Sequence, residues 1–355
     1  MERSVIVENL NKSFKVKKKS GFLKTLFTPE YRQLQAVDGI SFHLNQGERV
    51  AFVGPNGAGK STTIKILSGI LFPDDGHVQI DGFVPWIDRR KMAYRIGTVF
   101  GQRSQLWYHL PARDTFELLS YAYEMSRADF AARMRYLTGA FAAEEIIEKP
   151  VRQLSLGERM RCEIIASLLH RPRILFLDEP TVGLDVVSKG VIRDLIKQTS
   201  EQDGTTVLLT SHDTGDMERV CDRVIVIDHG HLVTDRPVKE LRSGFIRQKV
   251  MALTMKAEHI DFSMRNAAIA GAEGVNGRAV EVMETQPYFL KLKIDTSQIL
   301  VETVLQHVMT QTSLTDITIE DPPMEDIITS IYAQNKAVRP TGASGSPSPQ
   351  DTALL

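Results

Sequence analysis

Five short apolar runs alternate with longer helix-forming stretches over the first two thirds of the chain. The runs are continuous rather than alternating, which is typical of strands that are covered on both faces. Helices between such strands favour parallel crossover connections. We therefore predict an α/β core around a parallel sheet, with strands at residues 49–53, 95–100, 174–177, 206–210 and 224–228.

The segment between the second and third of these strands has a different pattern. It is rich in helix formers, above all at 114–125 and 127–141, and it contains no convincing strand. We therefore expect that a helical subdomain, at about residues 103–172, is inserted into the α/β core.

A second pattern begins after residue 236. Residues 288–294 alternate, so that Leu290, Leu292 and Ile294 face one way, as in a sheet with one buried face. We predict a large domain over 1–235, a small α+β domain over 236–336, and a mobile tail over 337–355 that is rich in proline, glycine, serine and threonine. The small domain should contain strands at 250–255, 278–284, 288–294 and 316–320, and helices at 298–310 and from Met324.

Composition narrows the class of protein. The 355 residues carry a formal charge of -1, with 42% apolar and 25% charged residues, which fits a folded globular protein and offers no general attraction to nucleic acid. No apolar run is long enough to cross a bilayer, and the start lacks a signal peptide, so we expect the chain to stay in the cytosol. Cys162 and Cys221 stand apart and are expected to be reduced thiols.

A glycine-rich loop follows the first predicted strand. Residues 54–61 read Gly-Pro-Asn-Gly-Ala-Gly-Lys-Ser, which fits GxxxxGK[ST], and a helix is expected over 61–70. In such a loop, backbone N–H groups point at phosphate oxygens, Lys60 reaches the β and γ phosphates, and Ser61 binds Mg²⁺. The alternative is a glycine-rich turn that holds no nucleotide.

Two adjacent acids end the third predicted strand. Asp178 and Glu179 lie where ligands bind in open parallel sheets, at the carboxyl end of a buried strand. Asp178 could hold Mg²⁺, and Glu179 could orient and deprotonate an attacking water. Alternatively, they merely cap the turn at Pro180.

With these motifs in order, residues 1 to about 235 resemble the nucleotide-binding subunit of an ATP-binding-cassette (ABC) transporter, a P-loop NTPase. The string Leu154-Ser155-Leu156-Gly157-Glu158-Arg159 is similar to the family signature Leu-Ser-Gly-Gly-Gln, with Leu156 and Glu158 as departures. In the family, this surface meets the nucleotide held by the opposite subunit. Ser155 and Gly157 open a predicted helix, whose dipole suits a γ phosphate, although a plain serine cap is the alternative.

The resemblance also assigns roles to single residues. It implies that Gln102 links Mg²⁺ and the attacking water to the membrane partner, that His212 contacts the γ phosphate, and that Asp185 belongs to a loop between subunits. Phe14 stands where an aromatic stacks on adenine, with core packing as its alternative. The cofactors would be ATP and Mg²⁺. The expected metal ligands are Ser61, Gln102 and Asp178, the catalytic residues Glu179, His212 and Gln102, and the nucleotide contacts Phe14, Gly54, Pro55, Asn56, Gly57, Ala58, Gly59, Lys60, Ser61, Thr62, Ser155, Gly157, Glu158 and Asp185.

Two surface segments suggest contacts beyond the nucleotide. Residues 12–24 hold six lysines and no acid, and could lie near anionic headgroups or form a solvated loop. The stretch from Gln102 to Pro111 is unusually aromatic, and in the family a membrane subunit docks there. We expect Leu106 and Trp107 to dock rather than to belong to the core.

These expectations combine into one function. The chain should be an ATPase that powers an exporter, of the branch that moves drugs, ions or polysaccharides. It would act at the cytoplasmic face of the inner membrane, paired head to tail with a second copy or a homologous ATPase subunit, on separate membrane permease subunits. The alternative is a soluble ABC protein acting on ribosomes or DNA; such proteins usually carry two cassettes or long coiled coils, and this chain has neither. A catalytically dead regulator would not need Lys60, Asp178, Glu179 and His212.

Overall fold

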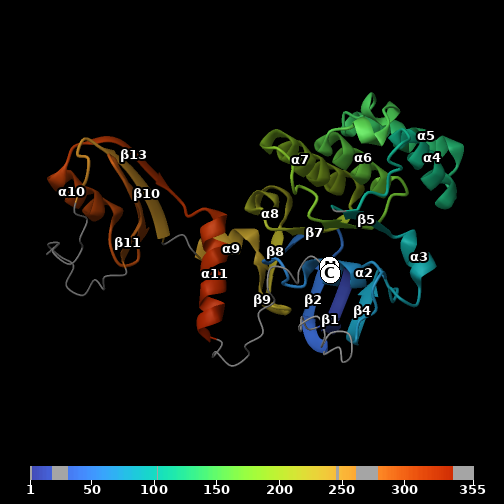
Figure 1. The fold of residues 1–355 in the computed structure, drawn as a ribbon, viewed down its shortest axis with the longest axis horizontal. Helices are drawn as coiled ribbons and strands as arrows, with labels where there is room; N and C mark the ends of the chain where they lie inside the picture. The colour runs from blue at the N-terminus through green and yellow to red at the C-terminus, as the bar shows by residue number, and fades with distance from the viewer. Residues whose placement is uncertain (1, 18–30, 102, 245–247, 261–278, 339–355) are drawn as a thin grey trace, which may run out of the picture. The chain divides into compact units, whose positions relative to one another are not determined.

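The computed structural model describes residues 2–17, 31–101, 103–244, 248–260 and 279–338. The described residues fall into two compact units, one reaching to Val238 and one starting at Lys239. Figure 1 shows the elements of both units. No helix in the described parts of the chain combines the length and the apolar character that crossing a membrane requires.

A six-stranded sheet forms the centre of the first unit. Its order is β5-β6-β7-β3-β8-β9, and the first five of these strands run parallel, which confirms the predicted core. β9 pairs antiparallel with β8 at one edge. The strands are β3 (Arg49–Val53), β5 (Ile96–Phe100), β6 (Ile174–Asp178), β7 (Thr206–Ser211), β8 (Arg223–Asp228) and β9 (His231–Pro237).

The first unit also contains an antiparallel sheet that was not predicted from the sequence. It has the order β2-β1-β4, with β1 (Arg3–Lys17), β2 (Tyr31–Asn45) and β4 (Asp75–Ile80). Register shifts interrupt the β1–β2 pairing, for example between Val7 and Leu10. Bulges of this kind break the two-residue period that marks a strand in a sequence.

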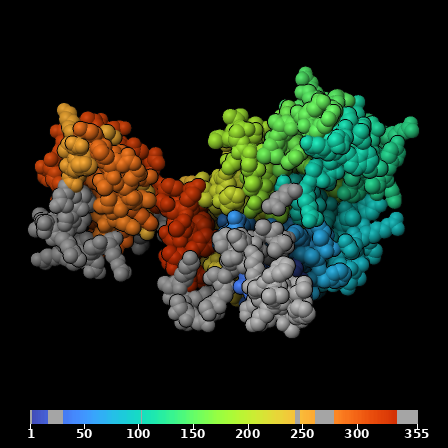
Figure 2. Space-filling model, in the orientation of Figure 1, coloured from blue at the N-terminus to red at the C-terminus, as the bar shows by residue number. Residues whose placement is uncertain are grey.

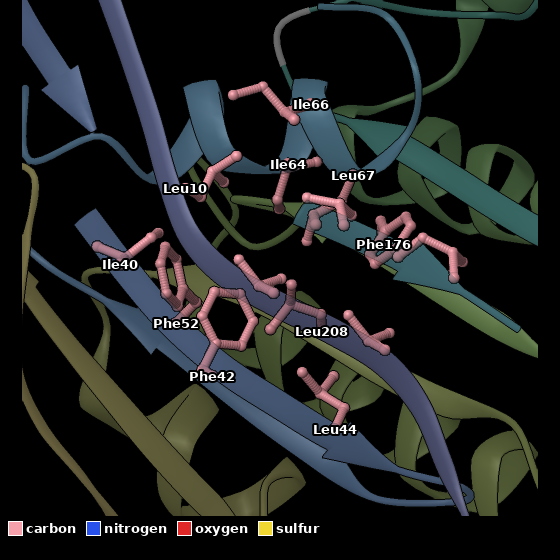
Figure 3. Close-up of a cluster of buried hydrophobic side chains, with 14 of the residues drawn as sticks. Leu10, Ile40, Phe42, Leu44, Phe52, Ile64, Ile66, Leu67, Phe176 and Leu208 are labelled. Atoms are coloured by element: carbon pink, nitrogen blue, oxygen red, sulfur yellow. The ribbon is translucent and has the colours of Figure 1, made fainter. Parts of the chain in front are cut away.

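The phosphate-loop helix α2 (Lys60–Leu67) belongs to a core shared with both sheets. Apolar side chains from this helix, from the antiparallel sheet and from one face of β3, β6, β7 and β8 form one buried cluster (Figure 3). Phe42 of β2 and Phe52 of β3 meet in it, with ring centroids 5.5 Å apart. The glycine loop that precedes α2 is therefore held in place by a helix that is packed into this core.

Helices cover the opposite face of the six-stranded sheet, where α6, α7 and α8 lie along it (Figure 1). The predicted helical insertion is present, and Figure 2 shows its atoms gathered together on this face (turquoise to green). Helices of this unit are α3 (Arg89–Ala93), α4 (Ala112–Ala122), α5 (Arg127–Ala140), α6 (Leu156–Leu168), α7 (Val186–Asp203) and α8 (Thr214–Val220), with short 3-10 turns η1 (Ile146–Glu148) and η2 (Val151–Gln153).

The second unit is the small α+β domain that the sequence indicated. Its antiparallel sheet has the order β11-β12-β10-β13, and Leu290, Leu292 and Ile294 are buried in its core together with Val304 and Val308 of α10. The elements are α9 (Val238–Gly244), β10 (Gln248–Met255), β11 (Val280–Gln286), β12 (Phe289–Asp295), α10 (Val301–Gln311), β13 (Leu314–Glu320) and α11 (Met324–Val338). Most of the expected tail, residues 339–355, lies outside the described residues.

Candidate functional site

The carboxyl ends of three neighbouring strands bring the candidate chemistry together. β7 lies between β6 and β3, so that Asp178 pairs with Thr210 and Ser211 pairs with Val53 in the parallel registers. The glycine loop after Val53, the acids at the end of β6 and the histidine after β7 therefore meet at one sheet edge. Ligands bind at this edge in open parallel sheets.

The glycine loop has a backbone conformation that favours glycine at two points. Gly57 and Gly59 have φ values of 80° and 105°, which L side chains disfavour. A Cβ on Gly59 would lie 2.3 Å from the Ala36 carbonyl oxygen, and one on Gly54 would lie 2.5 Å from the Ile227 carbonyl oxygen. Backbone strain and crowding together keep the loop free of side chains at these positions.

Lys60 begins α2 beneath this loop, with only 5% of its side chain exposed. Its Nζ donates to the carbonyl oxygens of Gly54 at 2.7 Å and Pro55 at 3.2 Å, and lies 3.7 Å from Glu179 Oε1. Burial lowers the pKa of Lys60, and the negative charges of Glu179 and Asp178 oppose that effect. Among the described residues, this buried ammonium contacts two loop carbonyls and one carboxylate, so it can also bind an anion.

Asp178 links the acids of β6 to the loop. Its Oδ1 accepts hydrogen bonds from the hydroxyls of Ser61 at 3.1 Å and Thr210 at 2.6 Å. The sequence reasoning did not single out Thr210, although a hydroxyl near the end of an apolar strand was a usable signal. Carboxylate and hydroxyl oxygens in this arrangement are ligands that Mg²⁺ prefers.

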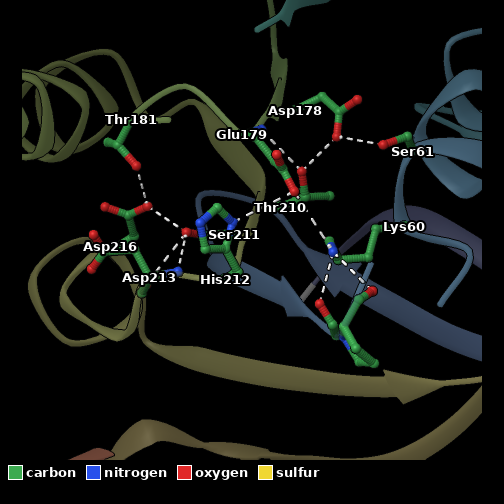
Figure 4. Close-up of polar contacts among 12 residues, drawn as sticks. Lys60, Ser61, Asp178, Glu179, Thr181, Thr210, Ser211, His212, Asp213 and Asp216 are labelled. Carbon is green, nitrogen blue, oxygen red and sulfur yellow. Dashed lines mark hydrogen bonds and ion pairs between the residues drawn. The ribbon is translucent and has the colours of Figure 1, made fainter. Parts of the chain in front are cut away.

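Glu179 adopts a backbone conformation that is rare for its type, with φ of 53°. Its N–H is held by the carbonyl oxygen of Thr210 at 3.1 Å and by Thr210 Oγ1 at 3.0 Å. The side chain turns towards the loop, where its Oε1 lies 3.7 Å from His212 Nδ1 as well as from Lys60 Nζ (Figure 4). His212 remains 58% exposed and can therefore reach a ligand placed over the loop.

The signature residues form a separate group. Ser155 caps α6, accepting from the Glu158 N–H at 3.3 Å, while Glu158 Oε2 accepts from the Ser155 N–H at 2.8 Å. These hydrogen bonds lower the pKa of Glu158. The helix cap considered as an alternative is thus present, and Glu158 forms the second half of a capping box.

Asp185 belongs to this second group. It caps α7 by accepting from the Ser188 N–H at 2.9 Å and hydroxyl at 2.6 Å, and the hydroxyl interaction lowers the pKa of Asp185. A Cβ on Gly157 would lie 2.8 Å from Ser188 Oγ, so the starts of α6 and α7 touch. Among the described residues, no hydrogen bond or ion pair joins this group to Lys60, Ser61, Asp178 or Glu179.

The remaining predicted nucleotide contacts lie around the loop or outside the described residues. Pro55 and Asn56 are exposed at its tip, Ala58 is buried, and Thr62 is half-buried on α2. Phe14 on β1 is half-buried and outside the core clusters, with Lys12 Nζ 5.6 Å from its ring centroid. Gln102 lies outside the described residues, although the preceding Gly101 donates its N–H to the Asp178 carbonyl oxygen at 2.9 Å.

The segment after Gln102 corrects one prediction. Leu106 is 5% exposed and packs inside, so the expectation that it docks a partner is wrong. Trp107, Tyr108 and Leu110 are 45%, 57% and 40% exposed, so that the apolar surface expected there is present.

The lysine-rich segment is only partly described. Lys12 pairs with Asp74 at 2.7 Å, and this hydrogen bond is the main cause that lowers the pKa of Asp74 to about 2. Residues 18–30, which carry the rest of the candidate lipid-facing stretch, lie outside the described residues.

These residues fit Mg-ATP. The loop has no room for a side chain at Gly54 or Gly59. Lys60 faces carbonyls and a carboxylate, and Ser61 and Asp178 offer oxygen ligands for a metal. Within the described ranges, no cluster of three His, Cys, Asp or Glu side chains could hold a metal by itself. A metal that takes its other ligands from phosphates and water needs no such cluster.

Comparison with known proteins places the chain in a family. The family model described as ABC transporter matches residues 37–182. Over 300 residues the chain is 31% identical to the linearmycin resistance ATP-binding protein LnrL of Bacillus subtilis (strain 168), covering 83% of this chain and 93% of that protein. Over 242 residues it is 32% identical to the daunorubicin resistance ATP-binding protein DrrA3 of Streptomyces coeruleorubidus, covering 68% and 73%.

A solved structure supports the same placement. The chain is similar to the dimeric structure of a post-hydrolysis state of the ATP-binding cassette MJ0796 bound to ADP and Pi. The TM-score is 0.56 and the identity 28%, over 66% of this chain and 98% of that one. Its fold, its site and these relatives show that the chain belongs to the ABC transporter family, as one of the ATP-binding ATPase subunits.

Proposed function

We propose that this chain hydrolyses Mg-ATP with Glu179 as the general base, and that it does so in a head-to-tail dimer that powers export through separate membrane subunits. The observation that carries the proposal is the position of Glu179 Oε1. This atom lies 3.7 Å from both Lys60 Nζ and His212 Nδ1. Glu179 directly follows Asp178 in the chain, and the Asp178 carboxylate accepts a hydrogen bond from Ser61. A carboxylate between two cationic or proton-bearing groups is suited to orient a water beside a phosphate.

The reaction follows from this arrangement. Water attacks the γ phosphorus in line with the bond to the β-γ bridging oxygen, Glu179 takes the proton from the water, and the bridging bond breaks to give ADP and inorganic phosphate. Lys60 and His212 stabilise the negative charge on the phosphate oxygens. Mg²⁺, when held by Ser61 and Asp178, would neutralise charge on the same oxygens.

The second copy is needed because the site in one chain is incomplete. The signature residues Ser155 and Gly157 are separate from the glycine loop and Lys60. They lie at the start of α6, and a helix start is suited to bind a phosphate. The apolar side chains around it are open, with Leu156 37%, Val186 85% and Val187 77% exposed. A head-to-tail partner would cover these side chains and bring its own signature group to the nucleotide.

Coupling to membrane subunits is supported by a surface and by relatives. Trp107, Tyr108 and Leu110 form an exposed apolar stretch close in sequence to Gly101, which touches the Asp178–Glu179 turn. Exposed aromatic clusters commonly mark contact sites. LnrL and DrrA3 are named for drug resistance, which fits an export system.

The test is the variant Glu179→Gln, with Glu117→Gln on the exposed face of α4 as its matched control. We expect Glu179→Gln to bind ATP as the unaltered protein does but to hydrolyse it at least about 100-fold more slowly. With saturating Mg-ATP it should accumulate as a dimer in light scattering, whereas Glu117→Gln should turn over normally. Unimpaired turnover by Glu179→Gln would remove Glu179 as the base. A strictly monomeric Glu179→Gln, alone and with its membrane partners, would remove the dimer.

A further inference from the structure

Asp216 is a fully buried acid beside the nucleotide site. It lies on α8 with 0% exposure. Its Oδ2 accepts hydrogen bonds from the hydroxyls of Thr181 at 2.6 Å and Ser211 at 2.5 Å (Figure 4). Its Oδ1 accepts from Arg193 Nε at 2.6 Å. Three separate elements therefore converge on one carboxylate.

Such a carboxylate is costly unless each of its partners stays in place. Burying an ionised acid costs several kcal/mol, which only close donors and a counter-charge offset. Thr181 and Ser211 are themselves buried, at 2% exposure each, so water cannot replace Asp216 as their partner. The cluster therefore holds its geometry as a unit.

The two hydroxyls stand next to the two residues that the proposed reaction uses at the γ phosphate. Thr181 follows Glu179 by two residues, in the turn where the Val182 N–H donates to the Glu179 carbonyl oxygen. Ser211 ends β7 and directly precedes His212. Binding both hydroxyls to one oxygen fixes the Glu179 turn against the His212 turn.

The counter-charge comes from the helix that begins at the Asp185 cap. Arg193 of α7 donates to Asp216 and also pairs with Asp213 at 2.8 Å. Gly215 leaves room for it, since a Cβ there would lie 2.8 Å from the guanidinium. Asp213 in turn pairs with Lys189 of α7 at 2.6 Å. The cluster is thus tied to the helix whose start carries the proposed dimer surface.

We propose that Asp216 is a positioning residue for ATP hydrolysis, which sets the spacing of Glu179 and His212 by holding Thr181 and Ser211 on one oxygen. It touches neither the nucleotide nor the water. The inference rests on the proposed function, because it concerns how the base and the histidine of that reaction are held. Loss of one hydroxyl should therefore slow the chemical step without weakening ATP binding.

The experiment compares Thr181→Val with Thr181→Ser, because removing Asp216 itself would leave a buried arginine without its partner and could prevent folding. We expect Thr181→Val to lower kcat at least about tenfold, as small misplacements of reacting groups do, with KM for ATP changed less than about twofold. Thr181→Ser keeps the hydroxyl and should restore kcat to within about twofold.

The matched control is Thr205→Val, directly before the start of β7. Thr205 is 3% exposed and donates to the Pro172 carbonyl oxygen at 3.3 Å, so this variant also removes a buried hydroxyl. We expect it to lower Tm but to keep kcat. If Thr181→Val keeps kcat as Thr205→Val does, the positioning role of Asp216 is overturned.

A double variant separates positioning from local damage. Thr181→Val combined with Ser211→Ala should be about as slow as the slower single variant, because the first change already disconnects the two turns. If the decreases in kcat of the two single variants multiply in the double variant, the two hydroxyls do not act together through Asp216. Glu179→Gln in the same assay keeps the two proposals apart. Normal turnover of that variant counts against the proposed function, whereas a slow Glu179→Gln beside a normal Thr181→Val counts against this inference alone.

Discussion

Ser61 Oγ lies 3.1 Å from Asp178 Oδ1, although the two residues are 117 positions apart in the chain. The contact exists because only β7 separates β3, which leads to the loop, from β6, which ends at Asp178. It places a hydroxyl and a carboxylate side by side at the carboxyl ends of these strands. The strand order therefore brings together the two oxygen ligands that we propose for Mg²⁺.

Asp178→Asn should weaken the response to Mg²⁺. An amide keeps the shape and one acceptor oxygen but loses the negative charge that binds the cation. We expect kcat to fall at least about 100-fold, as when one electrostatic group of a reaction site is lost. The Mg²⁺ concentration for half-maximal ATPase activity should rise. Asp194→Asn, which changes an exposed acid of α7, should leave both quantities unaltered; an unchanged Mg²⁺ titration for Asp178→Asn would argue against its role as a ligand.

Two glycines with positive φ should respond differently to the same substitution. Gly82 has φ of 84° but open space at its Cβ position, whereas Gly59 has both a φ of 105° and the Ala36 carbonyl oxygen 2.3 Å away. Gly82→Ala should cost about 1 kcal/mol of unfolding free energy and leave ATP affinity intact. Gly59→Ala should abolish ATP binding in a fluorescent-nucleotide titration. Equal ATP affinity for the two variants would contradict the tight fit of the loop.

The sequence indicated the parts of the fold that bury continuous apolar runs. The five parallel strands fall where those runs were read, because both faces of the sheet are covered. The antiparallel sheet was missed because bulges in β1 interrupt its alternation. The prediction for Leu106 was wrong because a leucine next to Trp107 and Tyr108 carries no signal in the sequence of which of these side chains is buried.

The grouping of Lys60, Ser61, Asp178 and Glu179 was predictable because each motif lies at the end of a strand, and their contacts confirm that they meet, whereas their roles stay predictions. The residues that contact this group were not predictable. Thr210 and Asp216 contact partners that are 32 and 35 residues distant, and no local spacing encodes such contacts. Positions of this kind become visible only when the strand order is known.

Trp107→Ala should weaken the association with membrane subunits. The indole is 45% exposed, next to Tyr108 and Leu110, and large exposed aromatics contribute most to protein contacts. We expect recovery of integral membrane partners from detergent extracts to fall at least about tenfold. Phe72→Ala removes a comparably exposed aromatic, at 56%, and should leave recovery unchanged. Recovery with ribosomes in place of membrane proteins would favour the alternative function.

Neither cysteine should react in the folded protein. Burial raises the pKa of Cys162 to about 12 and raises that of Cys221 as well, so the reactive thiolate is scarce near neutral pH. At pH 8, iodoacetamide should label neither residue under native conditions and both in concentrated urea, as measured by mass spectrometry. Rapid labelling of Cys162 in the native state would show that α6 opens locally.

His170 lies in a site that favours its neutral form. Its ring stacks on Tyr123 with centroids 3.9 Å apart, and its Nε2 lies 2.9 Å from the Ile96 carbonyl oxygen. Its Nδ1 is buried and has no hydrogen-bond partner among the described residues. Burial lowers the pKa of His170 from 6.5 to about 4, while the contact with Ile96 opposes that effect. A proton added at Nδ1 would have no acceptor within the described ranges.

This site predicts how stability depends on pH. The pKa of His170 is lower in the folded protein than in the unfolded chain, so protons bind the unfolded chain first as the pH falls. The contribution of neutral His170 to the unfolding free energy is therefore complete above pH 6.5 and is lost as the pH falls towards about 4. Between pH 7 and pH 5 the group should remove about 2 kcal/mol of unfolding free energy. Both tryptophans, Trp86 and Trp107, belong to the first unit, so their fluorescence in urea reports on it. His170→Gln should lose this part of the pH dependence, whereas the exposed-site control His77→Gln should keep it; equal pH dependence in the two variants would refute the assignment to His170.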